Sequence, residues 1–158
     1  MRYHRILFPA LFLFLLSCGK DTFETRPSLS LKSVSTRDLV PVIPADRTPN
    51  LVLTFEFTDQ EGDLAGAMIG VRKEVVNCPA SNFTDTLSYS ISADVPESRN
   101  LKGSVEIIFP YFKINPVCNF SPDDDFRGDS AIFYVWVRDK AGNVSDTANS
   151  GLIRIGKN

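Results

Sequence analysis

Apolar side chains recur at every second position along several short stretches of this 158-residue chain. The clearest stretch is residues 51–58, where the bulkiest apolar side chains share one parity: Leu51, Leu53, Phe55 and Phe57. Successive side chains of a β-strand point to opposite faces, whereas a helix repeats its apolar positions every three to four residues. The alternation therefore indicates strands that each bury one face, and it disfavours a helical fold.

Seven stretches of the chain have this strand-like character, and turn-forming residues separate them. They cover residues 29–34, 51–58, 67–77, 86–93, 105–109, 131–138 and 152–155. No window among them has a convincing helical period. Short strands at this spacing predict an all-β fold, and we expect residues 29–158 to form a single seven-stranded antiparallel β-sandwich.

The N-terminus has a different character from the rest of the chain. Residues 1–5 include two arginines, and residues 6–16 form an apolar run. That run is shorter than the ~20 apolar residues that a helix needs to span a bilayer. A basic start followed by a short apolar run predicts a secretory signal peptide over residues 1–17.

The apolar run ends in the sequence Leu15-Leu16-Ser17-Cys18. This ending resembles the lipobox of bacterial lipoproteins, in which a small residue precedes an obligatory cysteine. The resemblance implies that the Cys18 sulfur receives a diacylglycerol and that cleavage exposes its amine to a third acyl chain. Several acyl chains make a stable membrane anchor, whereas one chain does not. The alternative is an ordinary signal peptide in which Cys18 is incidental.

Residues 18–28 are expected to form the lipidated cysteine and a polar tether. Lys20 and Asp21 are similar to the signals that send some Gram-negative lipoproteins to the outer membrane, although a solvated linker explains them equally well. The resemblance implies a lipid-anchored protein of the outer membrane, on its periplasmic or its cell-surface side.

The charge balance excludes several classes of function. The chain carries 17 Lys and Arg against 19 Asp and Glu, a net charge of −2. Removal of the signal peptide would make it more acidic and would take away its only histidine, His4. An acidic chain is a poor nucleic-acid partner. Without histidine, the mature chain lacks a Ser-His-Asp triad, a Cys-His pair and a His-ligated zinc site.

Two cysteines remain if Cys18 is lipidated, namely Cys78 and Cys118. An exported protein lies in an oxidising compartment, so we expect these two to form a disulfide. In a sandwich, successive connections alternate between the two poles, and this alternation places both cysteines at the same pole. The alternative is a pair of buried free thiols.

Acidic side chains gather in the turns that would lie at the opposite pole. Asp59, Glu61 and Asp63 follow one predicted strand, and Asp139 follows another. Calcium takes oxygen ligands of this kind, so these four residues are the candidate metal ligands. They do not form an EF-hand, because a loop starting at Asp59 lacks the glycine and the glutamate that the motif requires. One alternative is a solvated turn in which the carboxylates cap the backbone amides of the same turn. Another is a carboxylate acid–base pair, which would need a cleft that a loop tip does not evidently offer.

The sixth predicted strand and its turn have the pattern Phe133-x-Val135-x-Val137 followed by Asp139-x-Ala141-Gly142-Asn143. This pattern resembles the corner between the last two strands of immunoglobulin-like and fibronectin-type modules in bacterial surface proteins. The resemblance implies a fold and a setting but no activity. The Cys-Trp-Cys order of antibody domains is absent, because Trp136 follows both cysteines.

The same strand is apolar on both faces. If its odd-numbered residues point inward, then Ile132, Tyr134 and Trp136 line the outer face. An exposed aromatic row is a candidate platform for a protein or glycan partner, unless the N-terminal segment or a neighbouring long side chain covers it.

Together these features predict an envelope lipoprotein that acts as a non-catalytic binding, adhesion or accessory module. It would contact the membrane through its lipid, require no cofactor, and bind calcium only if the acidic turns form a site. One alternative is a structural subunit of a larger envelope complex that uses the same face. The other is a small hydrolase that uses the carboxylates.

The lipid anchor is directly testable. Cells grown with a labelled fatty acid should incorporate the label into this chain, and Cys18→Ala should abolish it, because the Cys18 sulfur is the first attachment point. Gel fluorography of the purified chain measures the label. Label that persists in the Cys18→Ala variant would contradict the anchor.

Overall fold

The computed structural model describes residues 24–42, 47–78, 84–118 and 127–157, and the elements below lie within these ranges. The predicted signal peptide and Cys18 lie outside them. The strands are β1 (Ser28–Val34), β2 (Asp38–Leu39), β3 (Leu51–Asp59), β4 (Met68–Val75), β5 (Thr84–Ser90), β6 (Leu101–Phe109), β7 (Gly128–Arg138) and β8 (Ala148–Gly156). A 3₁₀ turn, η3, covers Tyr111–Lys113. No helix in this part of the chain is long and apolar enough to cross a bilayer.

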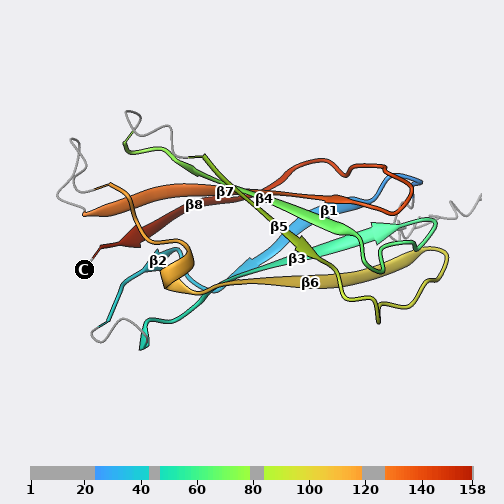
Figure 1. The fold of residues 1–158 in the computed structure, drawn as a ribbon, viewed down its shortest axis with the longest axis horizontal. Helices are drawn as coiled ribbons and strands as arrows, with labels where there is room; N and C mark the ends of the chain where they lie inside the picture. Colours follow the sequence, from blue (N-terminus) through green and yellow to red (C-terminus); the bar gives the residue numbers. More distant parts are fainter. Residues whose placement is uncertain (1–23, 43–46, 79–83, 119–126, 158) are drawn as a thin grey trace, which may run out of the picture.

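The strands form two sheets, which confirms the predicted all-β sandwich. One sheet has the order β1-β3-β6 and the other has the order β2-β8-β7-β4-β5. The strands of both run along the long axis of the molecule (Figure 1). The expectation of purely antiparallel pairing is wrong at β2, which pairs parallel with β8. This strand has only two residues, too few for an alternating pattern to appear in the sequence.

The core consists of side chains that point inward from the two sheets. Along β3, buried and half-buried residues alternate from Leu51 to Asp59. The facing strand β7 alternates in the same way and buries Phe133, Val135 and Val137. Phe109 of β6 bridges the layers, because its ring lies 5.1 Å from that of Phe133 and 6.2 Å from that of Tyr89.

Charged residues stand at three of the four ends of the inward rows on β3 and β7. The row on β3 ends in Asp59, and the row on β7 begins with Asp129 and continues past the strand to Asp139. All three aspartates are buried, and so is Lys73 on the inward row of β4. The core is therefore apolar at its centre and charged at its two poles.

The connections between strands lie at these two poles, as predicted from the way successive connections of a sandwich alternate between its ends. Residues 60–67, 91–100 and 139–147 lie at one end, and the described N-terminal segment enters β1 there (Figure 1, right). We call this end the tether pole. The opposite end holds Cys78, Cys118 and the C-terminus, and we call it the disulfide pole.

Adjacent residues on β6 test the alternation. Phe109 is fully buried and Ile108 is 51% exposed. We expect Phe109→Ala to lower the unfolding free energy by about 3–5 kcal/mol, because it removes core contacts and leaves a cavity. Ile108→Ala, the control, should change it by less than about 1 kcal/mol. Urea denaturation measures both, and similar costs for the two variants would contradict the assigned faces.

Candidate functional site

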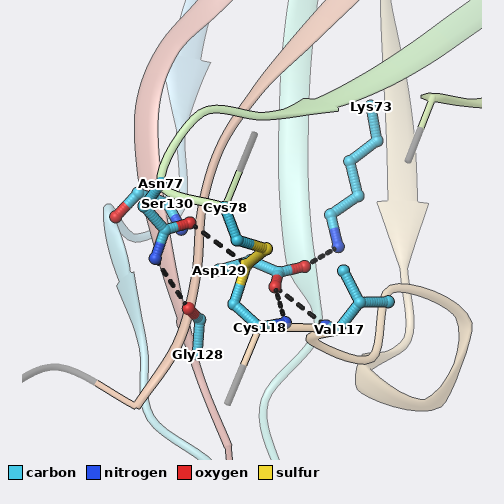
Figure 2. The surroundings of a disulfide bond; sticks show 8 residues. All are labelled: Lys73, Asn77, Cys78, Val117, Cys118, Gly128, Asp129 and Ser130. Carbon is cyan, nitrogen blue, oxygen red and sulfur yellow. Dashed lines mark hydrogen bonds and ion pairs between the residues drawn. A yellow bond between two sulfur atoms is a disulfide. The ribbon is translucent and has the colours of Figure 1, made fainter. Parts of the chain in front are cut away.

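The disulfide pole is braced by a covalent bond and a buried ion pair. Cys78 and Cys118 form a disulfide with their Cα atoms 6.0 Å apart, which confirms the predicted pairing (Figure 2). The bond joins the segment after β4 to the connection between β6 and β7. It closes a span of 40 residues. In the chain-entropy model such a loop stabilises the fold by about 3–4 kcal/mol.

Beside the disulfide, Lys73 of β4 reaches Asp129 at the start of β7. The Lys73 Nζ lies 2.5 Å from the Asp129 Oδ2 and also donates to the Ile114 carbonyl. The other carboxylate oxygen accepts the backbone N–H groups of Val117 and Cys118 at 2.8 and 2.9 Å (Figure 2). Both charges are thus buried, paired with each other and hydrogen-bonded to backbone groups, which is the condition under which a buried pair is tolerated.

Asn77 completes this brace. Its side-chain nitrogen donates to the Gly128 carbonyl, and its side-chain oxygen accepts the Ser130 N–H. Figure 2 shows these bonds on the opposite side of the disulfide from Lys73. Side-chain groups here are committed to backbone and to each other, so the pole is a structural brace. Sequence reasoning did not single out Lys73 or Asp129, although the inward parity of their strands includes both.

The tether pole gathers three of the four predicted metal ligands. Asp59, Asp63 and Asp139 each place a carboxylate oxygen within 4.8 Å of the other two. Asp59 ends β3 in one sheet, and Asp139 follows β7 in the other. Asp59 and Asp139 are buried, whereas Asp63 is half-buried. We call these three residues the aspartate cluster.

Two turns build the cluster. Their sequences are related, since Asp59 and Asp139 each lie three positions before a glycine. The Asp59 Oδ2 accepts the N–H groups of Gly62 at 2.6 Å and of Asp63 at 3.2 Å. Gly62 has φ +72°, and a Cβ there would lie 1.9 Å from the Ser98 carbonyl oxygen, so the turn requires glycine.

The second turn is closed in the same manner. The Asp139 carboxylate accepts the backbone N–H of Asn143 at 2.7 Å and its side-chain amide at 2.8 Å. The Asp63 Oδ2 accepts the Ala141 N–H at 3.2 Å and so links the two turns. Asn143 is the last residue of the pattern Asp139-x-Ala141-Gly142-Asn143, and its two N–H donors close this turn.

Two oxygens of the cluster remain without a hydrogen-bond partner. They are the Oδ1 atoms of Asp59 and Asp63. Burial raises the pKa of the Asp59 carboxyl, and the neighbouring charges of Asp63 and Glu61 raise it further, against the lowering effect of the two turn amides. No ion pair between described residues includes a member of the cluster.

Glu61, the fourth predicted ligand, is not among the residues that the structure brings together in the cluster. Its side chain is exposed, and it lines a separate shallow hollow with Gln60, Arg99 and Asn100. The turn that directs Asp59 and Asp63 inward leaves the residue between them facing solvent. The spacing of Asp59, Glu61 and Asp63 in the sequence does not by itself show which of these side chains a tight turn buries.

The predicted aromatic row lies on the outer face of β7. Ile132, Tyr134 and Trp136 are each half-buried. The Trp136 indole lies across Gly70, where a Cβ would approach its ring to 2.2 Å. The Arg72 guanidinium lies 4.8 Å from the centre of the Tyr134 ring, a cation–π contact.

The described part of the N-terminal segment leaves this face open. It pairs with β3 through β1 and with the edge of β8 through β2. Met68 and Leu152 flank the aromatic row and are 49% and 48% exposed. We call the surface formed by Met68, Ile132, Tyr134, Trp136 and Leu152 the aromatic face.

Comparison with protein-family models, curated proteins and solved structures finds no match for this chain.

The buried ion pair provides a stability test. Lys73→Met should lower the unfolding free energy by about 3–5 kcal/mol, because it leaves the Asp129 charge buried without a partner. Adding Asp129→Asn should restore part of the loss. Lys140→Met is the control, because the Lys140–Glu97 pair is largely exposed and should matter little. Urea denaturation of the oxidised chain compares them, and equal costs for Lys73→Met and Lys140→Met would contradict the structural brace.

Proposed function

We propose that this chain is an outer-membrane lipoprotein whose immunoglobulin-like sandwich acts as a non-catalytic module that binds a protein partner. The strand order supports the immunoglobulin-like type. With β2 set aside, the first, second and fifth strands share one sheet, and the third, sixth and seventh lie together in the other. Immunoglobulin constant domains group their strands A, B and E and their strands C, F and G in the same way. The place of β5 beside β4 departs from that arrangement.

The aromatic face is the observation that carries the proposal. Tyr, Trp, Met and Arg are enriched where proteins bind one another, and the aromatic face presents the first three with two arginines beside it. Arg72 of β4 lies opposite Tyr134, and Arg138 of β7 lies opposite Met68. The favoured partner is accordingly a protein whose surface combines an apolar patch with an acidic rim.

The geometry of attachment fits this function. The described N-terminal segment meets the domain at the tether pole, where Arg26 pairs with Asp146 and the Gln60 N–H donates to the Glu24 carbonyl. A polar tether of the expected length has a reach of ~15–20 Å if it is flexible. An anchor at Cys18 would hold this pole toward the membrane and leave the aromatic face accessible along the length of the sandwich.

The proposed absence of catalysis rests on how the buried charges are used. At the disulfide pole, Lys73 and Asp129 are committed to each other and to backbone groups. At the tether pole, the aspartates are built into tight turns.

Photo-cross-linking in intact cells tests the partner face. A photoreactive residue at Met68 should give a discrete protein adduct, and Arg72→Glu should reduce it by removing a charge that complements the partner. The control places the same residue at Ile108, which is equally exposed but lies on the other sheet. Immunoblotting against this chain measures both.

Each outcome bears on the proposal. An adduct from Met68 that Arg72→Glu weakens, with none from Ile108, supports the aromatic face as the partner surface. Equal adducts from both positions would contradict it, and so would no protein adduct, the result expected for a glycan ligand. An adduct with the mass of two copies of this chain would favour the structural-subunit alternative.

A further inference from the structure

We propose that Asp59, Asp63 and Asp139 bind a calcium ion that joins the two sheets at the tether pole. This inference does not depend on the aromatic face. It rests on the unpartnered oxygens of the aspartate cluster, on its charge and on its place in the fold.

The unpartnered oxygens point to a ligand. Asp59 is fully buried, and its Oδ2 is occupied by two turn amides while its Oδ1 has no donor. The Asp63 Oδ1 is also buried without a donor. A buried polar atom without a partner costs roughly 1–3 kcal/mol, and more if the group is charged. A cation bound between these carboxylates would supply the missing interaction.

The charge of the cluster points the same way. Three carboxylates approach within 4.8 Å, and none forms an ion pair with a described lysine or arginine. The contrast with Asp129, which is also fully buried, is direct, because Asp129 has Lys73 beside it. Like charges held this close in a partly desolvated site repel one another unless a cation balances them.

The donor set selects the class of cation. All three side chains offer carboxylate oxygens, which hard cations prefer, and none offers nitrogen or sulfur. Calcium accepts six to eight oxygens in flexible geometry and can complete its shell with backbone carbonyls and water. Magnesium requires a nearly ideal octahedron, which ligands from two independent turns are less suited to provide.

Calcium here would have a structural consequence that the sequence alone does not reveal. Asp59 ends β3, Asp63 lies in the sheet-to-sheet connection that follows, and Asp139 follows β7 in the opposite sheet. A shared ion would close the tether pole as the disulfide closes the other. The Asn143 amide also reaches the Thr25 carbonyl at 3.5 Å, so the ion would steady the segment through which the domain meets its tether.

The full chain, freed of metal with EDTA and purified in detergent, tests the site. Titration calorimetry should show one calcium ion per chain. At a calcium concentration about 100-fold over Kd, the Tm should rise by several degrees. No binding at millimolar calcium would overturn the proposal, and binding of magnesium in preference to calcium would overturn the assignment of the ion.

Matched variants separate a metal site from an acidic turn. Asp59→Asn and Asp63→Asn should each abolish the calcium-dependent rise in Tm, whereas Glu61→Gln should retain it, because Glu61 lies in the same loop but outside the cluster. In EDTA, Asp63→Asn should melt no lower than the unaltered chain, since it removes a repelling charge from the cluster. A calcium response that survives Asp63→Asn, or that Glu61→Gln removes equally, would overturn the proposal. Cross-linking from Met68 would be unaffected by either result.

Discussion

The two sheets of this molecule are held together by the side chains between them, since each sheet satisfies its hydrogen bonds within its own layer. The inward rows of β3 and β7 dominate that contact, with Phe55 and Phe133 among the largest fully buried side chains. Alternation along a strand continues until the strand ends, so whatever occupies the last inward position is also buried. In this chain, aspartates occupy three of the four ends of these two rows, namely Asp59, Asp129 and Asp139. The need to satisfy buried charge at the poles is therefore built into the same pattern that forms the core.

The poles meet that need in different ways. At the disulfide pole, Asp129 receives an ammonium group and two backbone amides, and a covalent bond adjoins it. At the tether pole, turn amides satisfy part of the aspartate cluster, and two buried oxygens keep no donor. The first arrangement is complete with the groups of the chain alone. The second is completed by the calcium ion that we propose, which would make the stiffness of the tether pole depend on an ion that the disulfide pole does not need.

The sequence predicts the sheets well because alternation is a local property. It also predicts the disulfide and three cluster members, since alternating connections sort the loops between two poles. It misses β2, whose two residues pair through tertiary contact with β8. It misses Lys73 and Asp129 because charged residues were not expected inside, although the parity of Ile69 and Val71 continues to Lys73. It does not separate Glu61, which lies outside the cluster, from Asp59 and Asp63, because the direction of each side chain in a tight turn depends on backbone angles such as the positive φ of Gly62.

The aromatic face lies on the outer side of β7, whereas Asp139 of the aspartate cluster continues the inward row of that strand, so partner binding and ion binding can be tested with separate readouts. The central claim is that calcium joins two turns from opposite sheets. Amide hydrogen exchange of the full chain, with and without calcium, tests it most directly. Calcium should slow exchange in residues 59–66 and 139–145 and leave residues 73–78 and 114–118 unchanged. Identical exchange in both conditions, or slowing at the disulfide pole alone, would contradict the account.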